Sequence, residues 1–154
     1  MLDETIMEGI RRHIQPIGGL EHARLLEIQP GLAKVSVEIG KENLNLYGNL
    51  HGGFLFALCD MAAGMAAYAY GMTNVTMQGS LSFIRGVQGG TIYAEAVSQH
   101  RGRSTVVNRV TVRDEEGRLV ADGTYTMFLT GNVGAMEGSR SNPDPAVSAR
   151  NLQN

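Results

Sequence analysis

Apolar and polar residues alternate along four segments in the second half of the chain. These segments are residues 74–83, 92–96, 104–113 and 119–129. Alternation with a period of two is typical of strands that bury one face. A Gly89-Gly90 turn precedes the second segment and Asp114–Gly117 precedes the fourth. Strands joined by such short turns predict an antiparallel sheet.

The first half of the chain predicts two further strands and an amphipathic helix. Residues 22–29 and 33–39 are the strands, with Pro30-Gly31 as the turn between them. Proline sets the first central dihedral of such a turn, and glycine supplies a positive φ at the second. Residues 2–14 carry apolar side chains four apart, which predicts the helix. Residues 41–52 are polar and glycine-bearing, and predict a loop.

The most apolar segment, residues 53–70, predicts a second helix. It has no wide polar face, so it must be covered nearly all round. A sheet wrapped about the helix would cover it, which makes the expected fold class α+β. A membrane span over residues 54–72 is rejected, because Asp60 lies within it and no Lys or Arg flanks it closely.

The same patterns divide the chain into three parts. Residues 1–19 hold the N-terminal helix and a turn, and residues 20–131 form a single domain. Residues 132–154 are rich in Gly, Ser, Asn and Pro and show little periodicity. They predict a mobile tail without a function of its own.

The composition excludes some classes of partner and compartment. The formal net charge is -2 and no run of Lys and Arg occurs, so a nucleic-acid partner is not expected. The single cysteine, Cys59, cannot form an intrachain disulfide, and its apolar neighbours favour a small buried hydrophobe over a nucleophile. The first residues lack the apolar stretch of a signal peptide, so a cytoplasmic location is expected.

Candidate chemistry lies at the start of the apolar helix. His51-Gly52-Gly53 stand there, and the glycines let a ligand approach the backbone closely. The first N–H groups of a helix lack intrahelical partners and lie at the positive end of its dipole, which suits a carbonyl oxygen that becomes an oxyanion. Asp60 follows two turns after Gly53 on roughly the same face. Its carboxylate could act as a base or a nucleophile.

Each of these residues also has a purely structural interpretation. Asp60 could be a buried carboxylate satisfied by backbone or hydroxyl donors, or an interface residue. His51 alone could cap the helix or fix the loop. Glycines before a helix are common. The combination therefore carries more information than any one member.

Asn45, His51-Gly52-Gly53 and Asp60 together resemble the hotdog-fold thioesterases of the phenylacetate-pathway type. The blocks Leu81–Arg85 and His100–Ser104 also match that family, and the resemblance covers about residues 20–130. It implies hydrolysis of acyl-CoA thioesters with aromatic or medium-length acyl groups, and a central helix wrapped by an antiparallel sheet. It further implies homodimers that build two equivalent sites and join in pairs as a homotetramer.

The resemblance gives each residue of the motif a role. Asp60 would be the general base or nucleophile. The Gly52 N–H would polarise the thioester carbonyl, with Gly53 beside the substrate. Asn45 and His51 would hold the geometry of the site, by positioning water or the thioester.

In this family a hydroxyl from the partner chain often assists. Thr76 is the first candidate for it, Ser80 is the second, and Gln78 on the same polar face is a weaker option. Simple polar alternation on a half-buried strand is the favoured explanation for each of the three taken singly.

The phosphates of CoA would favour cations near the mouth of the site. Three arginines match the family's phosphate-contacting neighbourhood: Arg85, Arg101 and Arg103. Each of them could also be a solvated charge in a turn. No metal is expected, because the four histidines are scattered along the chain. No cofactor is expected either, since CoA is part of the substrate.

Two other functions fit the same fold class. One is a non-catalytic acyl-CoA sensor, which the carboxylate of Asp60 argues against. The other is a hydratase or dehydratase acting on acyl carrier protein. Such enzymes normally place a histidine and an acid differently from His51 and Asp60.

Overall fold

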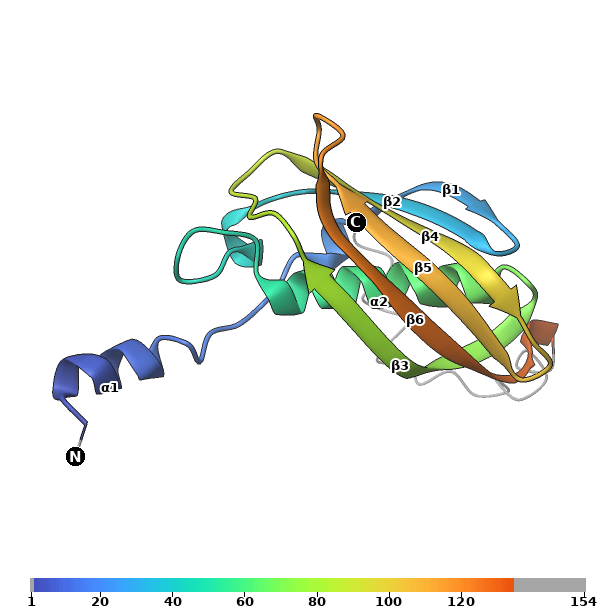
Figure 1. Ribbon diagram of the computed structural model, residues 1–154, viewed down its shortest axis with the longest axis horizontal. Helices are drawn as coiled ribbons and strands as arrows, with labels where there is room; N and C mark the ends of the chain where they lie inside the picture. Colours follow the sequence, from blue (N-terminus) through green and yellow to red (C-terminus); the bar gives the residue numbers. More distant parts are fainter. Residues whose placement is uncertain (1, 135–154) are drawn as a thin grey trace, which may run out of the picture.

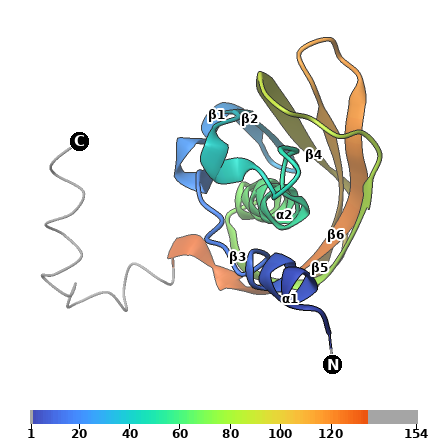
Figure 2. The ribbon, with the colours of Figure 1, turned by 90° about the vertical axis from the view of Figure 1, so that its left-hand side faces the viewer.

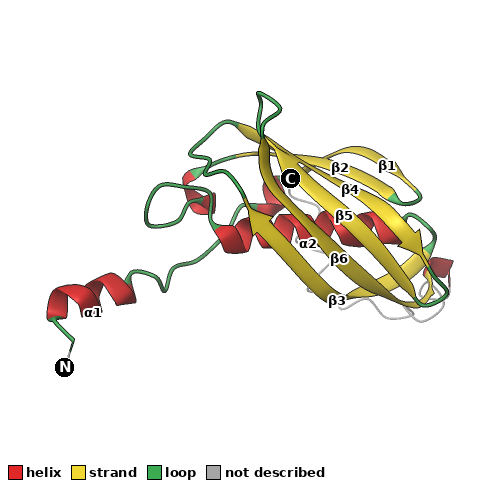
Figure 3. Ribbon diagram, in the orientation of Figure 1, coloured by secondary structure: helices red, strands yellow, loops and turns green. Residues whose placement is uncertain are grey.

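The computed structural model describes residues 2–134, and its centre is one antiparallel sheet of six strands in the order β1-β2-β4-β5-β6-β3 (Figures 1 and 3). The strands are β1 (Arg24–Gln29), β2 (Leu32–Glu38), β3 (Met72–Phe83), β4 (Thr91–Arg101), β5 (Thr105–Arg113) and β6 (Leu119–Asn132). The helices are α1 (Glu4–Arg11) and α2 (Gly52–Tyr68), with short 3-10 turns at Leu20–His22 and Lys41–Asn43. The predicted α+β class is confirmed. The tail predicted for residues 132–154 lies almost wholly outside the described residues, and the division into domains stays a prediction.

The sheet curls around α2, as Figure 2 shows in a view along the helix. Small residues on the buried side of α2 let the strands approach closely. Its buried residues are Phe54, Leu55, Leu58, Cys59, Ala62, Ala63, Ala66 and Ala67. No described residue covers the opposite side, where Gly53 is exposed and Tyr68 is 50% exposed. Within residues 2–134, the expectation that α2 is covered nearly all round is therefore wrong, because one side of the helix is not packed against the sheet.

A buried amide joins the sheet to the middle of α2. Asn108 on β5 is fully buried, and its Nδ2 donates to the Ala63 carbonyl at 3.1 Å. Its Oδ1 accepts from the Ser98 hydroxyl at 2.7 Å. Both the nitrogen and the oxygen of this amide are hydrogen-bonded. The side chain therefore joins the helix to β4 and β5 without leaving a buried polar atom unpaired.

The substitution Asn108→Asp is expected to lower the free energy of unfolding by about 3 kcal/mol. The new oxygen has the same shape as the amide nitrogen but faces the Ala63 carbonyl, so two acceptors meet in a buried place. Chemical denaturation measures the loss. Asn74→Asp is the matched control, because Asn74 Nδ2 donates to the Gly64 carbonyl of the same helix at 3.2 Å from a half-buried position. Equal losses in the two variants would contradict the role given to burial.

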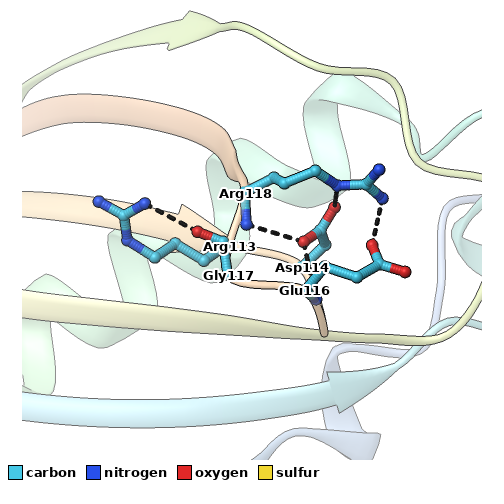
Figure 4. Close-up of polar contacts among 5 residues, drawn as sticks. All are labelled: Arg113, Asp114, Glu116, Gly117 and Arg118. Carbon is cyan, nitrogen blue, oxygen red and sulfur yellow. Dashed lines mark hydrogen bonds and ion pairs between the residues drawn. The ribbon is translucent and has the colours of Figure 1, made fainter.

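The turn between β5 and β6 is held by one carboxylate (Figure 4). Asp114 accepts from the backbone N–H groups of Glu116 and Arg118 at 3.0 and 2.9 Å, and from Arg118 Nε at 2.8 Å. Burial alone would raise the pKa of Asp114, but the hydrogen bonds from Arg118 hold that pKa below its usual value. Gly117 supplies the positive φ of 77°. The turn predicted over Asp114–Gly117 is thus confirmed, and Arg118 stabilises it through its hydrogen bonds to Asp114.

Helix α1 is shorter than the predicted 2–14 and lies apart from the sheet (Figure 1). It begins after Asp3, whose side chain accepts from the Thr5 N–H at 2.7 Å as an N-cap. None of its residues is buried.

Candidate functional site

The start of α2 is capped by His51. Its Nδ1 accepts from the Gly53 N–H at 2.9 Å. A neutral ring that accepts at Nδ1 carries its proton on Nε2, so this contact assigns His51 to capping. No hydrogen bond within residues 2–134 uses the N–H of Gly52, which is the first residue of the helix. That N–H is therefore available to a carbonyl oxygen.

The loop before α2 is shaped by Asn45. Its Oδ1 accepts from the backbone N–H groups of Tyr47 and Asn49 at 2.9 and 3.1 Å. The backbone of His51 is tied in turn to the Asn43 carbonyl at 2.7 Å. Asn45 thus shapes the loop that carries His51 and Gly52, and its role toward water or the thioester stays a prediction.

Asp60 lies half-buried on the side of α2 that faces β3. Its Oδ1 accepts from the hydroxyl of Thr76 at 2.5 Å. Within the described part of the chain this is the one side-chain donor to Asp60, and no cation pairs with it. A carboxylate with one hydroxyl partner and a half-buried position retains lone pairs for water or substrate.

Thr76 is expected to assist from a partner chain, whereas the structure gives its hydroxyl to Asp60 of its own chain. Thr76, the second choice Ser80 and the weaker option Gln78 are all exposed, but Ser80 and Gln78 do not share the face of Thr76. The reason is a bulge at Met77, where the register with β6 shifts between Thr76 and Gln78. Beyond the bulge, Gly79 lies on the inner face of β3. A Cβ at this position would meet the rings of Phe56 and Tyr125, so no larger residue fits there.

An aromatic wall lies between Asp60 and Gly52, and the sequence pattern does not identify it. Phe56 stands one turn before Asp60, with its ring centroid 5.1 Å from that of Tyr125. Phe83, at the end of β3, lies so close to Gly52 that an added Cβ would be 3.3 Å from its ring. Inward-facing positions of a strand depend on the bulge, so only the folded structure reveals this wall.

Gly52 borders a small hollow of about 280 Å³ that Asn45, Leu55, Phe83 and Arg85 also line. A second hollow beside Gly52 is lined by His51 and, from the N-terminal segment, by His13 and Gln15. No sequence signal points to His13 or Gln15. A ligand pocket for a drug-sized molecule usually measures about 300–1,000 Å³. Beside Gly52, one chain therefore offers less volume than a bound acyl-CoA needs.

The three candidate phosphate-binding arginines do not lie together in one chain. Arg85 borders the hollow beside Gly52, at the start of α2. Arg101 lies at the other end of the helix, 4.9 Å above the ring of Tyr70. Arg103 follows in the turn between β4 and β5 and is exposed.

Cys59 is fully buried, and burial, with the nearby Asp60 charge, raises the pKa of its thiol to about 12. The expectation that it is a buried hydrophobe is confirmed. Among residues 2–134 no group of three or more His, Cys, Asp or Glu could hold a metal ion. In the same range, no helix is long and apolar enough to span a membrane.

Comparisons with known proteins identify the family and support the fold. Residues 47–121 match the family model described as Thioesterase superfamily. The Escherichia coli acyl-coenzyme A thioesterase PaaI is 30% identical over 98 residues, which are 63% of this chain and 70% of that protein. A Streptococcus mutans protein solved with acetyl CoA superposes with a TM-score of 0.71 at 34% identity, covering 78% of this chain and 98% of that one.

A "hypothetical thioesterase protein" from Streptococcus pneumoniae, solved with coenzyme A, superposes with a TM-score of 0.75 at 33% identity. The match covers 77% of this chain and 96% of that one. The pneumococcal protein has also been solved with alanine in place of one aspartate, and in place of one threonine sixteen residues later. Asp60 and Thr76 have the same separation of sixteen.

Proposed function

This chain belongs to the thioesterase superfamily and is a thioester hydrolase, and from this premise we propose that it hydrolyses acyl-CoA thioesters to the free acid and CoA. The observation that carries the proposal is the pair of chemical groups along α2: an unused N–H at Gly52 and a half-buried carboxylate at Asp60. The relatives solved with coenzyme A and acetyl CoA support CoA esters as the substrate class.

The reaction needs an activated carbonyl and a base or a nucleophile. The Gly52 N–H would bind the thioester oxygen and stabilise the oxyanion of the tetrahedral intermediate. Asp60 would either take a proton from the attacking water or attack the carbonyl carbon itself, in which case water then hydrolyses the mixed anhydride. The CoA thiolate leaves and takes up a proton. This chemistry requires no cofactor.

Gly52 and Asp60 are too far apart to act on one carbonyl from the same helix. Eight residues of α-helix span roughly 12 Å, whereas both groups must lie within about 3 Å of the reacting atoms. The strand β3 is an edge of the sheet, and Val75 and Met77 on it are 55% and 62% exposed. A second copy paired along β3 would bring its own Asp60 toward this Gly52. The proposed site therefore takes Gly52 from one chain and Asp60 from the other, in a homodimer with two equivalent sites.

The first test is release of CoA thiol from a panel of acyl-CoA esters that includes aromatic and medium-length acyl groups. Turnover of at least one ester, at a rate proportional to enzyme, is expected. Tight binding of acyl-CoA with no turnover across the panel would reject hydrolysis and support the sensor function instead.

Co-expression of two inactive chains tests the two-chain site. A Gly52→Pro chain lacks the N–H and an Asp60→Asn chain lacks the carboxylate. A mixed dimer would hold one site with both defects and one intact site, so random pairing is expected to restore about a quarter of wild-type activity. If activity stayed at the level of the separate variants, both groups would have to come from one chain.

A further inference from the structure

Helix α1 carries an apolar stripe that no other part of residues 2–134 covers. Its Ile6 and Ile10 are 52% and 46% exposed, and no residue of the helix is buried. An isolated helix shorter than about 12–15 residues is marginal in water, and α1 has eight residues. Such a helix needs a surface on which its apolar stripe can pack.

The charges of α1 favour a protein surface over a lipid or nucleic acid. Arg11 pairs with Glu4 at 2.6 Å and Arg12 pairs with Glu8 at 2.9 Å, all four on the helix itself. Its polar side thus has no unpaired cations, whereas helices that lie on membranes present a face rich in Lys and Arg. An apolar stripe beside a self-neutralised polar side is typical of a helix packed on protein.

The position of α1 indicates which protein surface is within reach. The segment after α1 is fixed to the rest of the domain by two hydrogen bonds. Gln15 Nε2 donates to the Leu44 carbonyl at 3.3 Å, and the Gly18 N–H donates to the Glu42 carbonyl at 3.2 Å. From there α1 points away from the sheet, at the end where α2 begins and on the side of β3 (Figures 1 and 2). That side holds the unpaired edge strand and its exposed apolar residues, so a second copy paired there would meet α1.

We propose that α1 is an arm exchanged between two copies of this chain. Ile6 and Ile10 of each copy pack on the body of the other, and the two-fold symmetry makes both contacts equivalent. The arm leaves the body beside the hollow formed by His13, Gln15 and Gly52. Docking of the arm therefore also fixes the segment that borders the start of α2. The assignment rests on the exposed helix and does not depend on the reaction catalysed.

Hydrogen exchange of residues 4–11 in the full chain, across a dilution series, tests the arm. Protection of these amides is expected to rise with protein concentration, because only a second copy covers them. The variant Ile6→Gln/Ile10→Gln should lose this protection and self-associate at least tenfold more weakly in sedimentation velocity. The matched control Glu4→Gln/Glu8→Gln changes the polar side of the same helix and should behave as wild type.

Three outcomes would overturn the proposal. One is exchange of residues 4–11 at the unprotected rate at every concentration. The second is equally strong self-association of the isoleucine variant and its control, with both folded by circular dichroism. The third is protection that appears only with vesicles of phosphatidylcholine and phosphatidylglycerol, which would assign the stripe to a lipid surface.

Discussion

Replacement of Asp60 by Asn is expected to lower kcat/KM for acyl-CoA hydrolysis by about 10²–10⁴-fold. The amide is nearly isosteric, and its oxygen can still accept from the Thr76 hydroxyl, but it can neither take a proton from water nor attack the carbonyl. Binding of the ester should change little, since the variant loses a group needed in the transition state. Thiol release measures the first effect, and calorimetry with acyl-CoA measures the second.

Asp122→Asn is the matched control for this variant. Asp122 also accepts hydrogen bonds in a half-buried place, but from Arg109 at 3.1 and 2.9 Å, across β5 and β6 and away from α2. The same loss of charge there should leave kcat/KM near the wild-type value. If Asp60→Asn retained activity within a few-fold, the bond to Thr76 would have to be structural, and another group would have to serve as the base.

The sheet and the central helix could be predicted because their patterns are long and regular. The period of two along β4, β5 and β6 marks one buried face on each of these strands, whereas β3 has no buried residue. The apolar run of residues 53–70 falls within two residues of α2 at both ends. The end of α1 was harder to predict, because apolar residues four apart continue to Ile14 while the helix ends at Arg11. Tertiary packing normally stabilises such a helix, and none of the other described residues buries a residue of α1.

The bulge in β3 shows why the site was only partly predictable. Strict alternation places Thr76, Gln78 and Ser80 on one face, and the extra residue at Met77 separates Thr76 from the other two. A bulge depends on how two strands pair and not on one strand's own sequence. For the same reason the aromatic wall of Phe56 and Phe83 could not be derived from a single segment.

The local features of the motif around α2 were predictable from the sequence, but the assembly of a complete site from them was not. The position of Gly52 at the helix start follows from local sequence, and so does the capping alternative for His51. The distance between Gly52 and Asp60 follows from helix geometry alone. What a sequence of one chain does not give is the second chain that this distance requires.

Gly52→Pro is expected to lower kcat/KM by about 10²–10³-fold, the usual effect of losing one oxyanion donor. Proline removes the N–H at the first helical position, where that group has no intrahelical partner, so the helix itself loses nothing. His51 already has the extended conformation that a residue before proline adopts, with φ -67° and ψ 130°. Thiol release from the preferred ester measures the change.

Gly52→Ala separates the N–H from the effect of added atoms. Alanine places the same Cβ at 3.3 Å from the ring of Phe83 as proline does, yet it keeps the N–H. Alanine should therefore retain activity within about tenfold, and the further loss with proline reports the hydrogen bond. Equal losses in the two variants would mean that crowding against Phe83 is the cause. Full activity of the proline variant would remove Gly52 from the mechanism and leave the Phe54 N–H as the remaining helix donor able to bind the oxyanion.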